Sequence, residues 1–220
     1  MTIDSTLTIS LIIGALVGAA SAYLGSIMIL KRLALVGDAL SHVALPGIGV
    51  ALVLTFNPFL GAFTALALGI FLIWQIERRT SVPTDAIVGL IFTVAQAIGI
   101  FITPEPQLLE ALFGDIAKVS VGDAVLAGVL SFLIFAVMYP IKNKLALSLL
   151  SPDLAKSQRI NVDKLNLLFL ALVAVVVALG VKVVGTLLMG ALVVIPAAAS
   201  KNLARSFSGF GKFSIVFGVL

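Results

Sequence analysis

Long apolar runs follow one another along almost the whole chain, and short polar segments separate them. We place these runs at residues 7–30, 33–56, 58–76, 84–103, 121–141, 165–181 and 183–200. Runs of about 17–24 apolar residues are long enough to cross a bilayer as α-helices. A further run covers residues 213–220 and is too short to do so. The pattern predicts an all-α fold, a polytopic transmembrane helical bundle with seven spans plus a partial eighth.

We expect residues 1–220 to form a single transmembrane domain. The first run is too long for the core of a signal peptide, and no basic segment precedes it, so we interpret it as a mature span. The short last run would leave backbone polar groups unsatisfied in lipid. We interpret it as a sign that the chain is truncated at its C-terminus.

The composition supports a membrane protein. The mean hydropathy is +1.24 and only 11% of residues are charged, whereas about a quarter are charged in soluble domains. The chain contains no cysteine, so a disulfide framework and a thiolate metal site are excluded. The formal charge of +4 does not indicate a nucleic-acid partner, because the basic residues lie in the gaps between apolar runs.

The distribution of charges predicts the topology. If the sides of the membrane alternate from an outer N-terminus, the basic residues other than Lys118 and Lys182 fall inside: Lys31, Arg32, Arg78, Arg79, Lys142, Lys144, Lys156, Arg159, Lys164, Lys201, Arg205 and Lys212. This positive-inside bias predicts a multi-pass protein of the cell membrane with its N-terminus outside. The outer side receives acidic residues, which either attract cations or are simply tolerated in outer loops: Asp4, Glu105, Glu110, Asp115 and Asp123. We expect Lys182 to snorkel to the outer interface.

Asp38 and His42 are the candidate metal ligands. His42 is the only histidine and follows Asp38 by about one helical turn, which puts the two Cβ atoms roughly 5–6 Å apart on one face. A carboxylate and an imidazole at this spacing can hold one divalent transition metal. His42 lies ten residues after Arg32, which is roughly 15 Å into the membrane. Because Asp costs ~2.5–3.5 kcal/mol at such a depth, we expect a functional role.

Two other interpretations of this pair stay open. The Asp and His side chains could form a structural hydrogen bond that joins two helices. They could instead ligate a catalytic metal in an intramembrane metalloenzyme, but such a site needs at least three protein ligands. The chain supplies one histidine, so this second alternative is weaker.

The longest polar segment on the inner side begins at Ser151. Ser151 is suited to an N-cap, Pro152 to the first helical turn, and Asp153 to the positive end of the helix dipole. We therefore expect a short helix on the membrane surface that presents Leu154 and Ala155 to a partner. The alternative is an unengaged, solvated loop.

Four segments together resemble the permease subunits of metal-ion ABC transporters, the class that takes up zinc, manganese and iron. They are residues 34–47, 112–116, 151–161 and 184–199. The resemblance covers essentially the whole chain. It implies that the segment after Ser151 couples to the ATPase through Ser151, Pro152, Asp153, Leu154, Ala155, Lys156 and Arg159.

The same resemblance implies a homodimer that transports a divalent metal ion, zinc or manganese, with no permanently bound cofactor. It also implies two partners, a cytoplasmic ATP-binding subunit and an extracytoplasmic metal-binding protein. The chain lacks a P-loop motif, so it is not expected to be an enzyme and ATP hydrolysis would belong to the partner. A permease for an iron–siderophore or similar chelate is the alternative within transport.

Overall fold

The computed structural model describes residues 3–114 and 120–220, and all regular elements in this part of the chain are helices. They are α1 (Ile3–Leu30), α2 (Ala34–Val53), α3 (Pro58–Arg79), α4 (Thr84–Ile102), α5 (Glu105–Phe113), α6 (Val121–Leu150), α7 (Pro152–Ser157), α8 (Val162–Lys201) and α9 (Phe207–Val219). Asp115, Lys118 and the side chain of Asp4, expected on the outer side, lie outside the described part.

Within the described residues, six helices are long and apolar enough to cross a membrane, namely α1, α2, α3, α4, α6 and α8. The apolar helix α9 has 13 residues and is shorter. The prediction of an all-helical membrane bundle is confirmed, but the described residues contain six long apolar helices and a shorter one rather than seven separate spanning helices and a partial eighth. The difference arises because the predicted spans at 165–181 and 183–200 both lie within α8.

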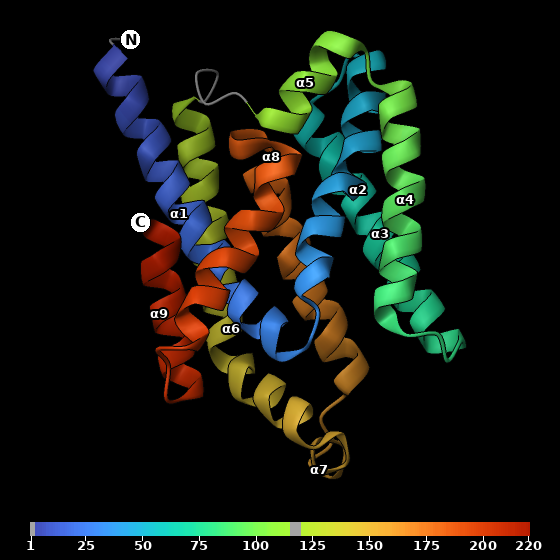
Figure 1. Ribbon diagram of the computed structural model, residues 1–220, viewed down its shortest axis with the longest axis vertical. Helices are drawn as coiled ribbons and strands as arrows, with labels where there is room; N and C mark the ends of the chain where they lie inside the picture. The colour runs from blue at the N-terminus through green and yellow to red at the C-terminus, as the bar shows by residue number, and fades with distance from the viewer. Residues whose placement is uncertain (1–2, 115–119) are drawn as a thin grey trace.

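Helix α8 is interrupted at Gly185, whose φ of 76° and ψ of 173° are not helical. A straight helix would separate Asn166 from Val193 by about 40 Å. Yet Asn166 is hydrogen-bonded to Lys31, and Val193 packs against Gly37, only six residues further along the chain. The chain therefore reverses direction at Gly185, as Figure 1 shows. We refer to residues 162–184 as the first half of α8 and to 186–201 as the second half.

Close approach of helices depends on glycine. A Cβ on Gly47 of α2 would lie 2.0 Å from the carbonyl oxygen of Gly61 on α3, and a Cβ on Gly18 of α1 would lie 2.0 Å from that of Gly218 on α9. Small residues allow this backbone contact between membrane helices. Helix α2 is consequently packed between α3, α4 and α8, whereas α1 packs against α6, α8 and α9 (Figure 1).

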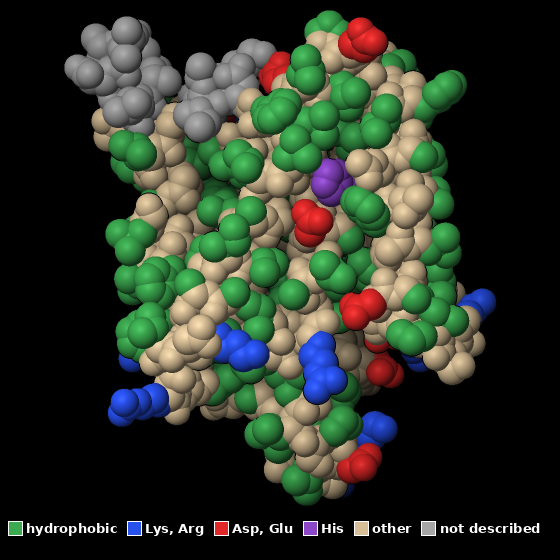
Figure 2. Space-filling view, viewed as in Figure 1, with side chains coloured by type: hydrophobic (Ala, Val, Ile, Leu, Met, Phe, Trp, Pro, Cys, Tyr) green, Lys and Arg blue, Asp and Glu red, His purple; other side chains and the backbone are tan. Residues whose placement is uncertain are grey.

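The two ends of the bundle differ in charge. Lys and Arg side chains gather at the end that carries α7, the α1–α2 turn and the start of α8, which we call the basic end (Figure 2). Helix α5 lies at the opposite end (Figure 1). Its last turn is followed by Gly114, with φ of 74°, and a Cβ on Gly185 would lie 2.5 Å from the Gly114 nitrogen. The backbones at the end of α5 and at the break in α8 are therefore in direct contact.

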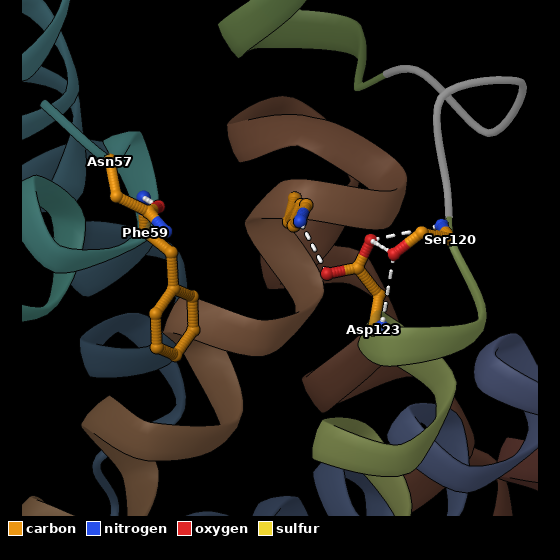
Figure 3. A network of polar contacts seen from close by, with 5 residues as sticks. Asn57, Phe59, Ser120 and Asp123 are labelled. Carbon is orange, nitrogen blue, oxygen red and sulfur yellow. Dashed lines mark hydrogen bonds and ion pairs between the residues drawn. The ribbon is translucent and has the colours of Figure 1, made fainter. Parts of the chain in front are cut away.

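Lys182, which the sequence placed at the outer interface, is partly exposed and has a specific partner. Its Nζ forms a 2.5 Å ion pair with Asp123 in the first turn of α6. The other carboxylate oxygen of Asp123 accepts hydrogen bonds from the hydroxyl and backbone nitrogen of Ser120, at 2.8 and 2.9 Å (Figure 3). The same figure shows Asn57, whose side chain accepts from the nitrogen of Phe59 at the start of α3. The pair joins the start of α6 to the end of the first half of α8.

Lys31 is enclosed at the basic end. Its ammonium group donates to the side-chain oxygen of Asn166 and lies 5.4 Å from the centre of the Phe169 ring. Burial lowers the pKa of Lys31 from 10.5 to about 8, and the negative charge of Glu77 acts in the opposite direction. The folded protein therefore holds this proton less tightly than the unfolded chain does.

This difference predicts a pH-dependent stability. Between about pH 8 and pH 10.5 the unfolded chain binds more protons at Lys31 than the folded protein, so Lys31 makes the free energy of unfolding rise with pH across this window. We expect the melting temperature of the purified wild type, relative to that of Lys31→Met, to rise as the pH is raised. The exposed Lys156→Met is the control and should show no such trend. Parallel melting curves for wild type and Lys31→Met would contradict the prediction.

Candidate metal centre

Asp38 and His42 lie one turn apart in α2, as the sequence predicted. The Asp38 side chain is exposed, whereas His42 is only 7% exposed. In Figure 2 the histidine, drawn in purple, is visible on one face of the bundle with an acidic side chain close to it. The two candidate ligands therefore share a face, one at the surface and one beneath it.

The His42 ring is fixed by packing. It meets the ring of Phe92 on α4 edge to face, with 5.2 Å between centroids and 78° between planes. Its Nδ1 atom is buried and has no hydrogen-bond partner among the described residues. Buried ring nitrogens normally have a partner, so an unpaired one is available to a ligand. In the described part of the chain no hydrogen bond joins Asp38 to His42, which disfavours a purely structural pair.

The donor set of one chain is incomplete. Among the described residues, no group of three or more His, Cys, Asp or Glu side chains could hold a metal ion. Zinc usually takes four ligands and manganese six, so a transported ion at Asp38 and His42 needs further donors besides these two side chains. The lack of a third ligand in the described chain also leaves the metalloenzyme interpretation without support.

The first turn after Ser151 forms as the sequence predicted. The Ser151 hydroxyl accepts a 3.3 Å hydrogen bond from the Leu154 nitrogen, with Pro152 and Asp153 in the first turn of α7. Leu154 is 57% exposed, whereas Ala155 is fully buried within the chain's own fold. Of the two side chains expected to face a partner, α7 therefore presents only Leu154. Lys156 and Arg159 are exposed, and Arg159 has a φ of 59° where the chain leaves the helix.

Two neighbours of the Asp–His pair were not predicted from the sequence. Phe92 covers the His42 ring, and Gly190 in the second half of α8 lies against the Asp38 side chain. Gly190 belongs to the segment 184–199 that carried part of the resemblance, so its position was singled out although its contact was not. Nothing in the local pattern distinguishes Phe92 from the other apolar residues of α4.

The arrangement of helices is that of an ABC transporter permease. It is similar to the structure of PsaBC from Streptococcus pneumoniae in complex with Fab, with a TM-score of 0.85 and 27% identity over 97% of this chain and 79% of that one. An inward-facing metal-chelate type ABC transporter has the same fold, with a TM-score of 0.77 and 20% identity over 96% of this chain and 73% of that one. The protein is therefore a multi-pass membrane permease, the transport subunit rather than the ATP-hydrolysing one.

A family model narrows this class. Residues 4–220 match the ABC 3 transport family, and the chain belongs to it. Curated relatives include the high-affinity zinc uptake system membrane protein of Haemophilus influenzae, 27% identical over 96% of this chain and 83% of the relative. The manganese transport system membrane protein of Listeria innocua is 29% identical over 96% of this chain and 77% of the relative.

Proposed function

We propose that this chain is the permease subunit of an ATP-driven importer for a divalent transition-metal ion, zinc or manganese, which passes Asp38 and His42. The relatives support this substrate class, because one is named for zinc uptake and another for manganese transport. One imidazole and one carboxylate suit either ion. A larger iron chelate would not require this pair of small, closely spaced ligands.

The exposed carboxylate of Asp38 carries the proposal. Asp38 lies in the first half of α2, a helix that is apolar enough to span the membrane. A carboxylate that faces lipid at such a depth costs ~2.5–3.5 kcal/mol, so this face has to be covered by protein or line an aqueous path. A second copy of the chain placed against it would bring two Asp–His pairs together. The homodimer would thus supply four protein ligands where one chain supplies two.

We infer the topology from the charge distribution and from the break in α8. We place the basic end in the cytoplasm and the N-terminus outside, in accordance with the positive-inside rule. The two antiparallel halves of α8 then cross the membrane separately. With α1, α2, α3, α4 and α6 the chain has seven crossings, and α9 enters the membrane beside α1.

Two partners complete the transporter. The ATP-binding subunit would contact α7 through Leu154, Lys156 and the residues around them, because α7 is the short surface helix at the basic end. An extracytoplasmic metal-binding protein would deliver the ion at the end that carries α5. The proposed function thus assigns one short helix to each membrane face.

The test is ATP hydrolysis by the complete complex reconstituted in proteoliposomes with the ATPase and the loaded delivery protein. We expect zinc or manganese to stimulate hydrolysis and to be accumulated inside the vesicles. Iron and an iron chelate are the comparison substrates. Accumulation of the chelate without accumulation of zinc or manganese would overturn the proposal.

A further inference from the structure

The second half of α8 packs along α2 in an antiparallel register. The Ser41 hydroxyl lies 2.7 and 2.8 Å from the carbonyl oxygens of Asp38 and Thr186, which share its single proton. About one turn further along α8, Gly190 lies against Asp38. The Val193 side chain then packs against Gly37. The candidate ligand Asp38 therefore sits inside a tight helix–helix contact, which is unusual for a side chain that is also exposed.

Gly190 is the residue that makes room for the Asp38 carboxylate. A Cβ at position 190 would lie 2.3 Å from the Oδ1 atom of Asp38 and 2.8 Å from its Cα and Cβ atoms. Rotation of the Asp38 side chain would relieve the first contact but not the contact with Cα. Any residue other than glycine at this position must therefore both turn the carboxylate away and move the two helices apart.

We propose that Gly190 is a positioning residue of the ion site, and that its missing side chain sets where the Asp38 carboxylate stands relative to His42. The inference rests on the proposed function, because it assumes that Asp38 binds the transported ion. The distance between the Asp38 carboxylate and the His42 imidazole determines the coordination geometry in which both can bind one ion. Zinc takes a small tetrahedral shell and manganese a larger octahedral one, so the position of Asp38 determines the preference between them.

The decisive variant is Gly190→Ala, compared with Gly25→Ala. A Cβ on Gly25 would lie 2.0 Å from the Val193 carbonyl oxygen, so this control crowds the same half of α8 about one turn away without touching Asp38. Both variants would be assembled with the ATPase in proteoliposomes. Uptake of zinc and of manganese would be measured over a range of ion concentrations and normalised to the amount of folded permease.

We expect Gly190→Ala to raise the KM for the ion about 10-fold or more, which is typical when the support of a metal ligand is lost, and to change the ratio of zinc to manganese uptake. Gly25→Ala presses on the backbone of the same half of α8 without meeting the Asp38 carboxylate, so it should change KM less and leave the ratio of zinc to manganese uptake at the wild-type value. A wild-type KM and ion ratio in Gly190→Ala, or equal changes in the two variants, would overturn the inference. Asp38→Ala distinguishes failure of this inference from failure of the proposed function. Normal uptake by this variant would refute the proposed function itself.

A stability measurement keeps the inference testable if Gly190→Ala transports too little to be analysed. Gly190→Ala should lower the melting temperature of the purified permease less in an Asp38→Ala background than in the wild type, because the clash with Oδ1 is then absent. The loss caused by Gly25→Ala should be the same in both backgrounds. An equal loss for Gly190→Ala in both backgrounds would show that the carboxylate is not what Gly190 accommodates.

Discussion

Asp38→Ala and His42→Ala should each reduce uptake of the transported metal by about 100-fold or more, while the amount of permease in the membrane stays at the wild-type level. Each substitution removes one of the two donors that a chain offers to the ion, a larger loss than the 10–100-fold typical of a residue that only supports a ligand. Removing a polar side chain from a membrane span lowers the cost of insertion, so misfolding is not the expected cause.

Asp38→Asn separates charge from shape at this position, since the amide keeps the volume that rests against Gly190. We expect it to reduce uptake nearly as much as alanine does. Leu35→Ala is the matched control, because Leu35 is 69% exposed about one turn before Asp38 on the same helix and carries no donor. Uptake and protein abundance would be measured together in cells. Metal accumulation near the wild-type level in Asp38→Ala or His42→Ala would refute a transport role for the pair.

Changes on the exposed face of α7 should separate ATP hydrolysis from transport. Leu154→Asp places a charge on a side chain that is 57% exposed and contributes little to the fold, so the permease itself should assemble normally. If Leu154 is a central contact with the ATPase, its loss costs about 2 kcal/mol, which corresponds to about 30-fold weaker binding. Lys156→Glu on the same helix should act in the same direction.

Lys201→Glu is the control for charge reversal, because Lys201 is exposed at the end of α8 and lies outside α7. The readouts are co-purification of the ATPase and the number of ATP molecules hydrolysed per ion transported. We expect both α7 variants to lose the ATPase or to hydrolyse ATP without transport, and Lys201→Glu to behave as wild type. Full co-purification with normal transport in Leu154→Asp and Lys156→Glu would rule out α7 as the coupling helix.

Features that depend on residues close in sequence were predicted well. The apolar runs indicated the spanning helices, and the order Ser151, Pro152, Asp153 indicated the start of α7. The placement of Asp38 and His42 one turn apart followed from helical periodicity alone. In each case the determining information lies within one helix, where spacing converts directly into geometry.

Features that depend on packing between distant segments were not predicted. Lys182 pairs with Asp123, 59 residues earlier, and no local pattern favours that partner over water. The burial of Ala155 depends on how α7 folds back, which hydropathy does not report. The turn between the predicted spans at 165–181 and 183–200 was expected, but the structure places it slightly later, at Gly185, whose positive φ hydropathy does not report. Helix α5 was missed because a nine-residue helix is too short to show clear periodicity.

The contact between Gly114 and Gly185 has a mechanical consequence. Main chain touches main chain there, so no rotamer change is available to absorb a displacement of α5. A displacement of α5 would therefore act directly on the backbone at Gly185 and on the adjacent Thr186. The carbonyl oxygen of Thr186 accepts a hydrogen bond from the hydroxyl of Ser41. Ser41 lies between the two candidate ligands on α2. We therefore expect a displacement of α5 to reach the backbone beside Asp38 and His42 through Gly185, Thr186 and Ser41.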